Sequence, residues 1–122
     1  MEDKILKTFM TMSEQFRVLH WQTESFAQHK AYGKIYESLS DLADKFMEEY
    51  MGKYGRCYFD GGYGSIRVYN INDMDIQKFV LHHIDIFNEL NEHLDDEDTN
   101  LLNIRDEIIG ELNQLKYLLT FK

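Results

Sequence analysis

The stretch GRCYFDGGYGSIRVYNIN, residues 55–72, interrupts a chain in which apolar residues otherwise recur at helical spacing. Within it, the sequence DGGYG at 60–64 is a turn signal, flanked by short runs of Tyr, Phe, Ile and Val residues. These flanking runs are compatible with a small β-hairpin. The stretch therefore predicts a long, non-helical connection between two helical halves of the chain.

Two helices are expected before this connection. The first covers residues 3–22, and the second runs from about Phe26 or His29 to Gly52, with Gly52 and Gly55 as stop signals. The apolar residues that share one face of the first helix are Ile5, Phe9, Met12, Phe16 and Leu19. Those of the second helix are Tyr32, Ile35, Leu39, Leu42, Phe46 and Tyr50.

Two more helices are expected after the connection, separated by an acidic loop at residues 95–99. Asn72 or Asp73 can cap the third helix, and Asp98 or Thr99 can cap the fourth. The apolar stripe of the third helix is Ile76, Val80, His83, Phe87, Leu90 and Leu94, and that of the fourth is Leu101, Ile108, Leu112, Leu115 and Leu119. His83, which lies within an apolar stripe, is expected to be a core histidine.

The lengths of the connections select among bundle topologies. The second helix is roughly 35–40 Å long at 1.5 Å per residue, and a connection of about 17 extended residues spans roughly 55 Å. It can therefore cross the bundle from one end to the other. Short, long, short is the order of connections in ferritin-like folds. We expect an all-α, ferritin-like four-helix bundle, a single domain over residues 1–122, with a long crossover between the second and third helices.

The composition limits the partners and the location. The 122 residues include 22 acidic and 13 basic side chains, for a net charge of −9. Such a chain repels phosphate backbones, and it has no basic tail, so nucleic acid is not an expected partner. Cys57 is the only cysteine, which fits a reducing compartment. No signal peptide and no apolar run of membrane-spanning length is evident, so we expect a cytoplasmic protein with no membrane partner.

Four residues are candidate metal ligands: His20, His29, Asp44 and Glu48. The histidines flank the tight connection between the first two helices, and the acids lie one turn apart on the second helix, opposite its apolar stripe. Imidazoles and carboxylates together suit iron or zinc. The same residues also fit a purely structural interpretation, in which the acids form a solvated face and the histidines pack near the turn.

The helix itself prevents one subunit from assembling this site. His29 precedes Asp44 by 15 residues (44 − 29) and Glu48 by 19 residues (48 − 29), roughly 22–28 Å along one helix. Two subunits can assemble it if their second helices pack antiparallel around a two-fold axis, because each histidine end then meets the other chain's acidic end. The pattern therefore predicts a homo-oligomer with two equivalent sites per dimer.

The same residues carry a resemblance to a known family. The sequence LHW at 19–21, followed by Phe26, His29, Asp44 and Glu48, resembles the signature of Dps-type mini-ferritins. The resemblance implies a four-helix subunit, a two-fold interface and a ferroxidase site across it, with two histidines from one chain and the acid pair from the other. It implies that the bound metal is iron or another divalent ion, and that the oligomer is a dimer or a closed cage.

This resemblance covers about residues 5–54 and 74–120, and the chain departs from it in places. The family has an Asp one turn after its second histidine, where this chain has Gly33, and Glu37 lies one turn further on. The glycine-rich stretch replaces the family's short linker helix, and the basic tail of its DNA-binding members is absent. The alternative is a ferritin-like structural or interaction protein that has lost ferroxidase activity.

Overall fold

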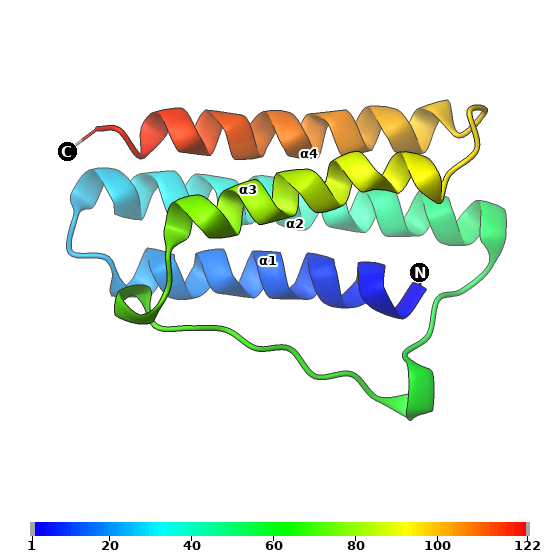
Figure 1. Cartoon of the computed structure of the whole chain (residues 1–122), viewed down its shortest axis with the longest axis horizontal. Helices are drawn as coiled ribbons and strands as arrows, with labels where there is room; N and C mark the ends of the chain where they lie inside the picture. Colours follow the sequence, from blue (N-terminus) through cyan, green and yellow to red (C-terminus); the bar gives the residue numbers. More distant parts are fainter. Residues whose placement is uncertain (1, 122) are drawn as a thin grey trace.

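The computed structural model describes residues 2–121, which form four helices packed together as a bundle (Figure 1). The helices are α1 (Glu2–Gln22), α2 (Phe26–Tyr54), α3 (Ile76–Glu89) and α4 (Thr99–Leu118), with short 3-10 turns η1 (Asp60–Gly62), η2 (Ile71–Asp73) and η3 (Leu90–Glu92). Residues 2–121 contain no β-strand. The prediction of an all-α four-helix bundle is confirmed.

The connections follow the expected order. Only residues 23–25 separate α1 from α2, so these two helices are antiparallel neighbours. Residues 55–75 then cross the length of the bundle, and α3 consequently runs in the same direction as α2 (Figure 1). α4 returns antiparallel to α3 (Figure 1). The crossover brings the start of α3 to the end of the bundle where α1 meets α2.

Aromatic rings join helices that are far apart in the sequence. The ring of Phe9 in α1 lies 5.4 Å from that of Phe46 in α2 and 5.5 Å from that of Phe87 in α3. Phe16 packs edge-on against Phe79 of α3, also at 5.5 Å. Full burial of such a side chain contributes about 1.5–3 kcal/mol, so these contacts hold α1 and α3 together across the core.

No helix within residues 2–121 is long and apolar enough to cross a membrane.

The expected hairpin in the crossover is wrong. Gly61 and Gly62 turn the chain at φ 77° and 88°, yet no strand pairing follows. The physical reason is that the segment is extended along the bundle and cannot also fold back on itself. α1 holds it in place instead: Gln15 donates from Nε2 to the carbonyl oxygen of Tyr69 (2.8 Å) and accepts from its amide at Oε1 (2.8 Å).

Two predicted helix caps act differently from expectation. The cap of α3 is Asp75, which accepts from the amide of Lys78 (3.1 Å), rather than Asn72 or Asp73. Asp98 does occupy the cap position of α4, but its buried carboxylate makes no capping bond there.

The carboxylate of Asp98 instead joins the end of α2 to the start of α4. It accepts hydrogen bonds from Lys53, from the Tyr54 hydroxyl (2.5 Å) and from the amide of Asp95 (3.0 Å). The hydrogen bonds from Lys53 and Tyr54 hold the pKa of Asp98 below its usual range. This ionised carboxylate therefore ties the end of α2 to the start of α4.

Replacing Gln15 tests its role as the anchor of the crossover. Gln15 is fully buried, and Gln15→Ala removes two hydrogen bonds to the Tyr69 backbone. We expect a loss of about 2–3 kcal/mol of unfolding free energy in urea denaturation. The control is Gln114→Ala on the exposed face of α4, which removes only a solvent-exposed hydrogen bond from Lys34. Equal effects of the two substitutions would contradict the anchoring role.

Candidate metal half-site on α1 and α2

His20 and His29 form a closely stacked pair at the junction of α1 and α2. Their ring centroids lie 3.9 Å apart, and the ring planes differ by 16°. Nδ1 of His20 lies 2.7 Å from the carbonyl oxygen of His29, and Nδ1 of His29 lies 2.8 Å from the carbonyl oxygen of His20. A carbonyl only accepts, so both Nδ1 atoms donate. In the neutral rings, each Nε2 therefore carries a lone pair, which is the form that binds metal ions.

The turn between the helices determines this pairing. Ser25 caps α2 by accepting at Oγ from the amide of Gln28 (3.2 Å), and Thr23 donates from Oγ1 to Oε1 of Gln28 (2.8 Å). These bonds fix a three-residue connection. The last turn of α1 and the first turn of α2 are thereby brought close enough for each histidine to reach the other's backbone.

Gly33 has a packing role that the sequence did not reveal. A Cβ atom at this position would lie 2.9 Å from Cε1 and 3.0 Å from Nδ1 of His20, closer than ordinary contacts allow. The His20 ring therefore rests directly on the α2 backbone at Gly33. The carboxylate that Dps-type proteins carry at this position does not fit beside the ring in its observed place.

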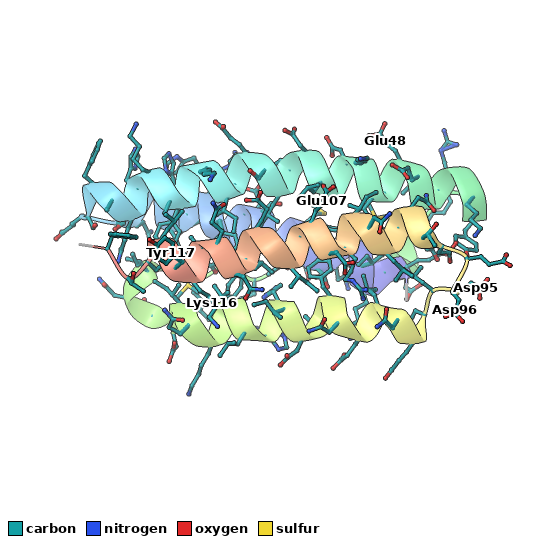
Figure 2. The ribbon with its side chains drawn as sticks, turned by 90° about the horizontal axis from the view of Figure 1, so that it is seen from above. Glu48, Asp95, Asp96, Glu107, Lys116 and Tyr117 are labelled. Atoms are coloured by element: carbon teal, nitrogen blue, oxygen red, sulfur yellow. The ribbon has the colours of Figure 1, made fainter. Side chains whose placement is uncertain are left out.

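Asp44 and Glu48 lie on the exposed surface of α2, toward its other end. Glu48 points away from the bundle (Figure 2). Neither acid forms an ion pair within residues 2–121. The structure thus brings the two histidines together and leaves the two acids apart from them. In the described part of the chain, no three His, Cys, Asp or Glu side chains gather as a metal site.

A shallow groove of about 240 Å³ lies between α1 and α2, beside Asp44. Its lining includes Leu6 and Met10 from α1, and Ala43, Asp44 and Met47 from α2. Met10 is 47% exposed. Leu6, Ala43 and Met47 are half-buried.

Arg17, which the sequence analysis did not single out, lies on the same face between the groove and the histidines. Its guanidinium stacks at 4.5 Å from the ring centroid of Tyr36 and forms an ion pair with Glu14 (3.6 Å). The available signal was its position three residues before His20, on the same side of α1.

His83 is separate from this site, as predicted. It is 4% exposed, and its Nδ1 lies 2.9 Å from the carbonyl oxygen of Phe79. Burial lowers the pKa of His83 below its usual value, so the ring is neutral at pH 7. The expectation of a core histidine is confirmed.

Comparison with known proteins identifies relatives without an assigned function. Residues 20–119 match the model of a family of unknown function, DUF5856. Over 56 residues the chain is 45% identical to an uncharacterized 14.6 kDa protein in the mobD-ri intergenic region of Enterobacteria phage T4. That alignment covers 46% of this chain and 44% of the phage protein. No solved structure is significantly similar to this chain.

Gly33→Ala tests whether the position of the His20 ring requires a residue without a side chain at position 33. The new methyl group would displace the ring and break its hydrogen bond to His29, at a cost of about 1–3 kcal/mol that opposes the helix-propensity gain of about 0.5–1 kcal/mol. The control is Gly110→Ala in α4, where a Cβ meets nothing within 4 Å and only the gain remains. Urea denaturation and the imidazole nitrogen shifts of His20 measure both effects. Equal stabilisation by both variants, with unchanged His20 shifts, would contradict the packing role.

Proposed function

We propose that this chain, which belongs to the family of unknown function DUF5856, is a ferritin-like protein of the Dps type that binds and oxidises ferrous iron at a site shared between two subunits. The observation that carries the proposal is the paired arrangement of His20 and His29, whose Nδ1 atoms both donate to backbone carbonyls. Fixing Nδ1 in this way sets the tautomer and leaves one Nε2 lone pair on each ring.

The missing ligands are supplied by a second copy. Asp44 and Glu48 are exposed and unpaired, and α2 is one continuous helix of 29 residues, so its ends cannot approach each other. When two α1–α2 faces pack around a two-fold axis, the histidine end of each chain meets the acidic end of its partner. The groove beside Asp44, with the exposed Met10, supplies apolar area for this contact.

The resulting donor set favours a single divalent ion at each site. Two neutral imidazole nitrogens and two carboxylates neutralise a divalent charge and suit ferrous iron or zinc. Because the stacked rings have nearly parallel planes, one ring must turn before both Nε2 atoms bind the same ion. Gly33 removes the further carboxylate that a second ion would need, and the contact with His20 leaves no room for it. Ferrous iron would be the substrate, giving up one electron to dioxygen or peroxide from solution, and the ferric product would be deposited within the oligomer.

The second candidate function is a structural or interaction protein with a ferritin-like bundle and no ferroxidase activity. Gly33 favours this second function, because the Dps pattern has a carboxylate at that position. The close contact between Gly33 and the His20 ring leaves no room for one. The rate of ferrous iron oxidation in air distinguishes the two functions. The first function accelerates this oxidation, whereas the second leaves its rate unchanged.

Mixed oligomers test the shared site. His20→Ala and Asp44→Ala proteins should each lose metal binding, whereas a heterodimer of the two keeps one site with all of its ligands. In an equal, random mixture, about a quarter of the wild-type sites should return, because about half of the dimers are mixed and each has one intact site. Titration calorimetry with ferrous iron under argon measures the recovery.

The matched control combines Asp44→Ala with Glu48→Ala subunits. Both changes fall in the same half of the site, so every site in that mixture lacks an acid and no recovery is expected. Native mass spectrometry confirms that mixed dimers are present in both samples. Equal recovery in the two mixtures, or none in the first, would refute a site shared between chains.

A further inference from the structure

A cavity of about 770 Å³, largely open to solvent, lies on a different side of the bundle, between α1, the crossover and α3. α1 contributes Lys4 and Lys7 to its wall, the crossover contributes Arg67 and Tyr69, and α3 contributes Phe79. None of these residues belongs to the His20, His29, Asp44 and Glu48 set. The cavity is therefore independent of the proposed metal site.

Hydrogen bonds from α1 hold the crossover in place beside this cavity. Gln15 fixes the backbone of Tyr69 with two hydrogen bonds of 2.8 Å, and Gln22 accepts from the amide of Ile71 at 2.8 Å. The segment next to these bonds carries Arg67, whose side chain lines the cavity. The crossover is therefore anchored beside the cavity before any ligand binds, which lowers the ordering cost of binding.

The cations of the cavity are its most unusual feature in a chain of net charge −9. Within residues 2–121, no carboxylate lies within 4 Å of the charged groups of Lys4 or Arg67, whereas Lys7 pairs with Asp3 at 3.1 Å. The carboxylates of Asp3 and Asp60 also line the cavity, and with Lys7 paired to Asp3, the cations Lys4 and Arg67 outnumber the one remaining acid. A guanidinium presents the fork that matches phosphate oxygens, so an anion fits at Lys4 and Arg67.

The remaining lining selects the kind of anion. A volume of about 770 Å³ falls within the range of small-molecule sites and far exceeds the size of inorganic phosphate. Tyr69 and Phe79 offer aromatic surface on which a planar group can stack.

Two acceptors in the same wall suit hydroxyl or amino groups. Asp60 contributes a carboxylate, and the 4%-exposed His83 has its Nδ1 engaged with the carbonyl oxygen of Phe79, so its Nε2 is the acceptor atom. A phosphate, a planar ring and several hydroxyl or amino groups occur together in nucleotides. From the charge, the size and the lining we infer that this cavity binds a nucleoside monophosphate, with its phosphate at Lys4 and Arg67.

Calorimetric titration of the whole chain with each of the four ribonucleoside monophosphates tests the inference. We expect at least one to bind saturably, at least about tenfold more tightly than its nucleoside or inorganic phosphate, since each lacks half of the contacts. Binding should also shift the imidazole NMR signals of His83. If inorganic phosphate binds as tightly as every nucleotide, or none binds more tightly than about 1 mM, the inference is overturned.

The matched variants are Arg67→Ala and Arg56→Ala. Both residues are exposed on the crossover, but only Arg67 lines the cavity. Neither forms an ion pair within residues 2–121. Arg67→Ala should weaken nucleotide binding by about tenfold or more, because a charged hydrogen bond to phosphate is lost. Arg56→Ala should bind like the parent chain. Equal affinities of the two variants would contradict the assignment, and circular dichroism verifies that both are folded.

Discussion

The continuity of α2 is the constraint on which the rest of the structure depends. Phe26–Tyr54 is a single helix of 29 residues, and such a helix is rigid over roughly 40 Å. It sets the length of the bundle, and it forces the following segment to travel the whole way back before α3 can begin. It also holds the histidine end and the acidic end of the same face permanently apart.

Local contacts at the two ends of α2 are correspondingly specific. At the first end, the hydrogen-bonded turn at residues 23–25 and the bare backbone of Gly33 hold two imidazoles in one stack with the same tautomer. At the other end, the buried carboxylate of Asp98 joins Lys53 and Tyr54 to the start of α4. Both ends are thus fixed by hydrogen bonds to the backbone or to a buried charge, while Asp44 and Glu48 between them remain free in the described chain.

Much of the fold could be predicted from the sequence, because apolar spacing reports directly which face of each helix is buried. The stripes, the short first connection and the length of the crossover were sufficient for a four-helix bundle and its order. The hairpin predicted at residues 55–72 was wrong. Turn signals and β-forming residues are local, and they do not show that the segment must stay extended to span the length of the bundle. The caps at Asn72 and Asp73 were wrong because several acidic or amide residues in a row can each cap a helix, and packing selects Asp75.

The candidate site was only partly accessible from the sequence. Spacing along one helix was enough to separate His29 from Asp44 and Glu48. It could not show that His20 and His29 exchange hydrogen bonds with each other's backbone, or that Gly33 lies under the His20 ring, because these contacts depend on the angle between two helices. The pairing of Gln15 with Tyr69 was hidden for a similar reason: a buried glutamine in a helix has no sequence signature until the backbone segment that it contacts is known.

A crystal structure of the protein soaked with iron, with anomalous scattering measured at the iron edge, tests the shared site most directly. We expect one anomalous peak beside Nε2 of His20 and His29, with Asp44 and Glu48 of a two-fold related chain completing the coordination, and two such peaks per dimer. A peak bound only by residues of one chain, or no peak at the histidine pair in an assembled dimer, would contradict it.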